Sequence, residues 1–192
     1  MATPWVNSVQ RTSTLTVFRA ANASGWASLL NTAITRFNAL SGMLTCNVAF
    51  NLTTTPPDPN TLAGANVQFA LANGNFSYKA FGVSGSGVLS ATASSGTTQV
   101  VQANGACVKA FIFLPARVQQ HNFMKICMIV HELVHAAGLS NSDHSSDADP
   151  DIFCSSLTPS GSGVQCGLFA NRVMPPIWMT NRTAAKIQAL WP

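Results

Sequence analysis

The feature that most constrains the fold of this chain is one mostly apolar helix that contains a few polar residues. Residues 118–138, VQQHNFMKICMIVHELVHAAG, have helical periodicity, and Gly138 marks the expected end of the helix. The piece ICMIV has the length of a core segment and is far shorter than the roughly eighteen apolar residues that a membrane helix needs. We therefore expect the helix to pack inside the fold and not to span a membrane.

Three polar residues in this helix indicate metal chemistry. His131 and His135 are four residues apart, so on a helix they point the same way, one turn apart. Two imidazoles at this spacing can bind one zinc ion, and Glu132, the only glutamate of the chain, can reach a water on the metal without binding the metal itself. Such a carboxylate can take a proton from water and return it to a leaving amine. The alternative is a pair of ordinary histidines on a helix face.

The remaining segments alternate in the order typical of an α+β fold. Two further helices are predicted, over 23–42 and from Thr180 to the end of the chain, because apolar residues recur there at helical spacing. Strands are predicted over 14–20, 44–53, 65–72 and 107–115, with one or two exposed strands inside 82–105. We find no internal repeat, and we expect residues 1–192 to form a single domain.

Charge and composition limit the partners and the location. Only 8% of the residues are charged, about a third of the usual share, and the net charge of +4 is spread without a basic cluster. This distribution argues against a nucleic-acid partner. A surface made polar by Ser, Thr, Asn and Gly is common in exported proteins. The first residues, MATPWVNS, do not resemble a signal peptide, so we expect a secreted monomer whose leader is absent from this sequence.

The chain has five cysteines, which leaves at least one of them unpaired within the monomer. Cys154 and Cys166 flank the segment SSLTPSGSGVQ, and a disulfide bond between them could close this loop. The alternative is that all five cysteines are small buried side chains.

The residues around the apolar helix resemble the signature of the metzincin clan of zinc endopeptidases, and within it the matrixin-like branch. The signature reads HExxHxxGxxH, and His131, Glu132, His135 and Gly138 match it. Glycine at this position allows the backbone to turn sharply towards a third ligand. The position of the third histidine of the signature is held by Asn141.

The next residues suggest where the third ligand stands. Matrixin-like sequences often continue from the glycine as "GL-DHSS", and this chain has DHSS at 143–146 after the extra residues SNS at 140–142. The resemblance therefore implies a three-residue insertion, with His144 as the third zinc ligand. The alternative ligands are Asn141, Asp143 and Asp147. We expect the acidic segment 143–151 to be a solvated loop, although alternate aspartates can also bind calcium.

The resemblance also implies features downstream of the helix. Met174, in RVMPPIW, corresponds to the methionine turn beneath the metal, with Met179 as a less fitting candidate. Ile177 and Trp178 would then wall a substrate pocket. An exposed strand before 107–115, either SGVLSAT or TTQVVQ, would pair with an extended substrate.

The implied fold is a metzincin-like α+β architecture. It has a mixed, mostly parallel twisted sheet with an antiparallel edge strand, three main helices, and an active-site cleft between a larger subdomain, 1–138, and a smaller one, 139–192. The implied function is a zinc metalloendopeptidase that acts on protein or peptide substrates. The alternatives are an inactive binding module of the same shape, in which Asn141 marks a lost ligand, and a cell-wall or toxin hydrolase with the same zinc chemistry.

Overall fold

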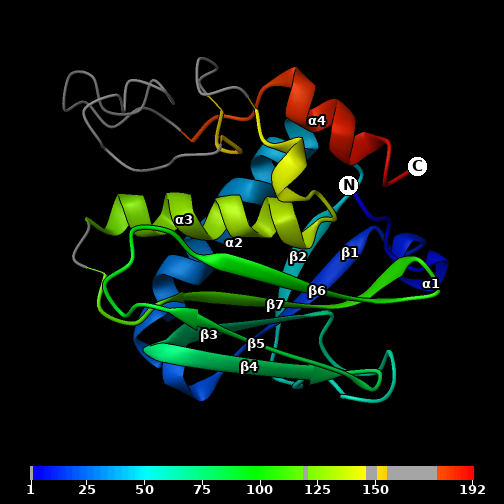
Figure 1. Ribbon diagram of the computed structural model, residues 1–192. Helices are drawn as coiled ribbons and strands as arrows, with labels where there is room; N and C mark the ends of the chain where they lie inside the picture. Colours follow the sequence, from blue (N-terminus) through cyan, green and yellow to red (C-terminus); the bar gives the residue numbers. More distant parts are fainter. Residues whose placement is uncertain (1, 119–120, 146–150, 155–176) are drawn as a thin grey trace.

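The computed structural model describes residues 2–118, 121–145, 151–154 and 177–192. Its centre is a five-stranded sheet in the order β2-β1-β3-β7-β6 (Figure 1). The first four strands are parallel to one another, and β6 pairs antiparallel with β7 at one edge. The prediction of an α+β fold with a mostly parallel mixed sheet is therefore confirmed. The strands are β1 (Thr14–Arg19), β2 (Ala49–Thr53), β3 (Val67–Ala72), β6 (Thr97–Ala103) and β7 (Ala106–Pro115).

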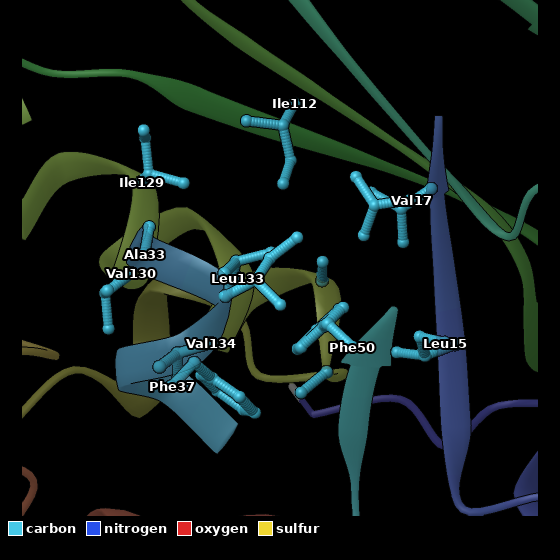
Figure 2. Packing of buried hydrophobic residues seen from close by; sticks show 14 of the residues in the cluster. Leu15, Val17, Ala33, Phe37, Phe50, Ile112, Ile129, Val130, Leu133 and Val134 are labelled. Atoms are coloured by element: carbon cyan, nitrogen blue, oxygen red, sulfur yellow. The ribbon is translucent and has the colours of Figure 1, made fainter. Parts of the chain in front are cut away.

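Two long helices cover one face of this sheet. They are α2 (Ala27–Met43), which follows the 3-10 helix η1 (Ala21–Trp26), and α3 (Asn122–Ala136). Side chains from both helices and from β1, β2 and β7 meet between the layers (Figure 2). Because α3 is enclosed by α2 on one side and by the sheet on another, its residues from Cys127 to Ala136 are all buried. Among the described residues, no helix is long and apolar enough to cross a membrane.

An antiparallel ribbon covers the other face of the sheet. It consists of β4 (Gly74–Ala80) and β5 (Val83–Leu89), and β4 was not predicted from the sequence. Phe76 stacks on Phe113 of β7 with ring centroids 4.3 Å apart, and Tyr78 stacks on Phe111 at 5.3 Å. Neighbouring β7 residues point to the opposite face, where they join the core beneath the helices. Strand β7 is therefore buried on both faces, which explains its almost continuous apolar sequence.

Both ends of the described chain meet at the carboxyl end of α3 (Figure 1). The indole nitrogen of Trp5, just before the short helix α1 (Asn7–Gln10), donates to the carbonyl of Ala136 at 2.8 Å. The indole nitrogen of Trp191, just after α4 (Asn181–Gln188), donates to the carbonyl of Ala137, also at 2.8 Å. These bonds satisfy two carbonyl groups that the end of a helix leaves without partners within the helix.

Candidate metal centre

Helix α3 supplies two buried imidazoles and a buried carboxylate. His131 and His135 are each 8% exposed, and Glu132 is 3% exposed. The two imidazole rings lie on the same side of the helix with their centroids 4.9 Å apart, as their spacing in the sequence predicts. The helix begins after His121, whose ring accepts a hydrogen bond from the backbone of Phe123. His121 therefore caps the helix and lies outside this cluster.

A sharp turn at Gly138 redirects the chain after the helix. Gly138 has a φ of 117°, a region that other residues rarely adopt. A Cβ atom at this position would lie 2.5 Å from the carbonyl oxygen of Thr3. Both the backbone conformation and the close approach of the N-terminal segment therefore require glycine here.

The three extra residues after Leu139 fold into part of a short helical turn. The 3-10 helix η2 (Asn141–Asp143) is closed by Ser140, whose backbone nitrogen and hydroxyl both donate to the Asp143 carboxylate, at 2.9 and 2.6 Å. Lys186 of α4 donates to the carbonyl oxygen of Asp143 and so ties this turn to the C-terminal helix. The residue directly after the turn is His144, so the turn delivers its side chain to the end of α3.

The structure brings three histidine side chains together at this point. One ligand nitrogen from each of His131, His135 and His144 lies within 4.8 Å of the others. The Nε2 atoms of His135 and His144 are 3.2 Å apart. Two nitrogen ligands of a tetrahedral zinc ion, each about 2.0–2.1 Å from the metal, lie roughly 3.3 Å from each other. The observed spacing therefore matches two ligands of one ion.

Hydrogen bonds orient two of these rings for binding a cation. Nδ1 of His131 lies 2.9 Å from the carbonyl oxygen of Ile152, and Nδ1 of His135 lies 2.9 Å from that of Leu139. Because a carbonyl can only accept, the proton of each neutral ring is on Nδ1, and the lone pair of Nε2 is free for a metal. Burial lowers the pKa of His131 to about 3 and that of His135 to about 4. Both rings are therefore neutral near pH 7, which is the form that binds metal, and the donor set fits a zinc ion.

The Glu132 carboxylate lies between α3 and the start of β6. Its Oε2 atom accepts a hydrogen bond of 2.6 Å from the hydroxyl of Thr98. A Cβ atom at Gly96 would come within 2.8 Å of Oε1, so the glycine leaves room for this carboxylate. Burial raises the pKa of Glu132 to about 7, while the bond from Thr98 acts in the opposite direction. A carboxyl group with this pKa can both accept and release a proton near neutral pH.

Two adjoining cavities open over the cluster. The first, of about 210 Å³, is lined by all three histidines and by Glu132, and the second has a volume of about 310 Å³. They share four lining residues, which come from β6, α3 and η2: Thr98, Gln99, His135 and Asn141. The second cavity continues along β6 to Gln102 and reaches Thr3 of the N-terminal segment. The histidine cluster therefore lies in a groove that follows the edge strand of the sheet.

The other candidate ligands lie outside the nitrogen cluster or outside the described residues. Asn141 is exposed and lines both cavities, while Asp143 uses its carboxylate to close η2. Asp147 falls in the part of the chain that the structure does not describe. Among the described residues, only the three histidines form a group that could bind a metal ion.

Several predictions concern the segment after His144. Met174 and Cys166 lie outside the described residues, and Cys154 is disulfide-bonded. Ile177 packs in the main core, and Trp178 is 49% exposed. Neither belongs to the described residues that line the two cavities, and their expected role as pocket walls stays a prediction.

Two residues near the cluster were not singled out from the sequence. Thr98 binds Glu132 across the groove, and the ring of Phe153 lies against all three imidazoles. One signal for Phe153 was available, because IF at 152–153 is an apolar pair that follows the acidic residues 147–151. No local pattern distinguishes Thr98 from Thr97, the other threonine of its strand, because the role of Thr98 depends on how β6 packs against α3.

Comparisons with known proteins do not place this chain in a family. A scan against models of protein families finds none that matches the chain, and a search of curated proteins finds no match either. The fold and the site together define the chain as an α+β protein with a group of three histidines, two buried and one half-buried, that could hold a metal ion.

Proposed function

We propose that this chain is a zinc-dependent endopeptidase of the metzincin type, with the groove along β6 as its active-site cleft. One observation carries the proposal: three imidazole nitrogens within 4.8 Å of one another share a cavity with the carboxylate of Glu132. The match to the signature HExxHxxG, with a three-residue insertion before His144, points to the same chemistry.

The proposed zinc ligands are His131, His135 and His144. Three neutral imidazoles suit zinc, and a catalytic zinc site commonly has three protein ligands and one open position. When bound, zinc would supply a Lewis acid that polarises a peptide carbonyl and makes water more acidic. The carbonyls of Ile152 and Leu139 keep two of the ligand rings in the tautomer that this role needs.

Glu132 is the proposed general base and acid. Its carboxylate shares the cavity with the three histidines and takes a proton from the attacking water as the water adds to the peptide carbonyl. It then gives that proton to the leaving nitrogen. The hydroxyl of Thr98 holds one oxygen of this carboxylate in place.

The edge strand β6 favours a peptide as the substrate. An extended peptide can pair with the main chain of an exposed sheet edge, which positions a scissile bond without reading any particular side chain. Of the two expected strands, TTQVVQ lies in β6 beside the histidines, whereas SGVLSAT overlaps β5 in the ribbon on the other face. We therefore assign β6 as the strand that binds the substrate.

A comparison of two acid-to-amide substitutions tests this proposal. Glu132→Gln should lower the rate of casein hydrolysis by about 10²- to 10⁴-fold, because it removes the general base, while the bound zinc measured by atomic absorption stays at the wild-type amount. The control is Asp58→Asn, at a half-buried turn residue that does not line the two cavities beside the histidines, which should keep the wild-type rate.

Equal rates of casein hydrolysis for wild type and Glu132→Gln would contradict the proposed mechanism. Wild-type protein that binds zinc and hydrolyses purified cell wall but not casein would identify a different scissile bond.

A further inference from the structure

The three imidazoles rest on one aromatic ring. The centroid of Phe153 lies 5.2 Å from that of His131, 4.8 Å from that of His135 and 4.6 Å from that of His144. The three interplanar angles are 36°, 70° and 65°, so one ring presents its surface to three differently tilted neighbours. Phe153 is fully buried. It is therefore the apolar side chain that the three histidines have in common.

The backbone around Phe153 is tied directly to the ligand segment. Ser145, the residue after His144, donates from its backbone nitrogen to the carbonyl oxygen of Phe153 at 2.8 Å and from its hydroxyl at 3.0 Å. The carbonyl of the preceding residue, Ile152, orients His131. A displacement of Phe153 would therefore move contacts to all three rings at once.

A buried aspartate anchors the same turn to the C-terminal helix. One oxygen of Asp151 accepts from the backbone of Phe153 at 2.8 Å. The other accepts from the hydroxyls of Thr180 and Thr183, at 2.5 and 2.6 Å, at the start of α4. This carboxylate is 1% exposed, and each of its oxygens is satisfied. The turn that carries Phe153 is therefore held against both the ligand segment and α4.

We propose that Phe153 is a positioning residue, an apolar floor that sets the relative orientation of the three metal-binding imidazoles. This inference rests on the proposed function, because it takes the three histidines to be metal ligands. A buried apolar side chain packed against all three imidazoles restricts their tilt, so that their lone pairs converge before a metal arrives.

The test measures metal binding directly, without catalysis. Cobalt(II) replaces zinc as the probe, because its visible absorption bands report the coordination geometry, and its dissociation constant is measured by titration. Phe153→Val opens space beneath the rings and should weaken cobalt binding by about 10- to 100-fold, the usual effect of removing a residue that supports metal ligands, and should alter the visible spectrum. Phe153→Met refills the space with a flexible apolar side chain and should restore binding to within about threefold of wild type.

A matched control separates this role from ordinary packing. Phe69→Val removes the same atoms from another fully buried phenylalanine, which packs on Trp26 and contacts no histidine ring among the described residues. It should lower thermal stability and leave the cobalt spectrum and dissociation constant unchanged. If Phe153→Val does not fold, Phe153→Leu carries the same test, because it removes the ring but retains more apolar volume.

The outcomes distinguish the inference from the function on which it rests. A wild-type cobalt complex that is unchanged in Phe153→Val, or weakened equally in Phe69→Val, would overturn the role of Phe153 alone. A wild-type protein that binds neither cobalt nor zinc would overturn both proposals. Weaker binding in Phe153→Val, recovery in Phe153→Met and an unchanged control would establish Phe153 as the floor of the site.

Discussion

Asn141 and His144 stand three residues apart at the two ends of one short turn, and only one of them joins the nitrogen cluster. We predict that His144→Ala weakens zinc binding by at least about 100-fold, because removing a ligand costs more than removing one of its supporting partners. Asn141→Ala should bind zinc as tightly as wild type. Competition with a chromophoric chelator measures both dissociation constants.

If Asn141→Ala weakens zinc binding and His144→Ala does not, the third ligand is Asn141, at the position that the signature without an insertion gives. Circular dichroism of both variants checks that the fold is retained. Since Asn141 is exposed, its replacement should have little effect on folding.

Sequence spacing predicted part of the site at this scale. The common direction of His131 and His135 follows from helix geometry alone, and the structure shows it. His144 could be proposed only through the resemblance, because no local pattern says where a chain goes after a glycine bend. Thr98 contacts Glu132 from a strand 34 positions earlier in the chain, and this contact depends on packing that no short sequence window contains.

At the scale of elements, the carboxyl end of α3 is held by indole groups from both ends of the chain. We predict that Trp191→Phe lowers the free energy of unfolding by about 1–3 kcal/mol, because the buried carbonyl of Ala137 loses its donor. Trp178→Phe is the matched control, since Trp178 is 49% exposed, and it should change stability by less than about 0.5 kcal/mol. Urea denaturation followed by circular dichroism measures both, and equal losses would contradict the capping role.

A second element-scale prediction concerns the anchor of the turn that carries Phe153. Asp151→Ala removes the acceptor of two threonine hydroxyls, one of them buried, and of two backbone nitrogens. We expect the free energy of unfolding to fall by about 3 kcal/mol or more, because buried donors are left unsatisfied. Asp58→Ala provides the comparison in the same urea denaturation series, because Asp58 is half-buried and its carboxylate accepts two solvent-exposed hydrogen bonds, from the backbone nitrogens of Asn60 and Thr61. A similar small effect for both variants would show that α4 does not depend on this anchor.

The elements themselves were predicted unevenly. Long apolar patterns gave β1, β3, β7 and α3 with boundaries shifted by only a few residues, and Thr180 caps α4 as expected. Strand β4 was missed because its sequence, GNFSYKA, has only two large aromatic residues, and these are partly buried through stacking on β7. The start of the helix predicted over 23–42 is a 3-10 turn, and α2 begins at Ala27.

At the scale of the whole molecule, a bound metal would join α3 to the segment that follows it. Zinc bound to the native state alone should stabilise it by about 4 kcal/mol at a thousandfold excess over the dissociation constant. We therefore predict that a strong chelator lowers the melting temperature and that added zinc restores it. His144→Ala should show a much smaller difference in melting temperature between the zinc-loaded and chelated states than wild type. An equal difference in the variant and in wild type would contradict a metal that joins α3 to the segment after it.

The class of fold could be predicted from the order of the segments, but the order of the strands within the sheet could not. Strand β3 pairs with β7 through partners more than 40 positions apart, such as Val67 and Ala110, and β4, β5 and β6 lie between them in the chain. Local patterns show which residues face a core, but long-range packing decides which strands become neighbours. The position of β6 at the sheet edge beside α3 is the result of that packing, and the proposed substrate groove depends on it.

A crystal structure of the zinc-loaded protein, with anomalous diffraction recorded at the zinc absorption edge, tests the central claim most directly. We predict one strong anomalous peak about 2.0–2.1 Å from a ring nitrogen of His131, His135 and His144, beside the carboxylate of Glu132. A peak bound without His144, or a fully occupied zinc ion elsewhere on the molecule, would contradict the three-histidine site and the mechanism built on it.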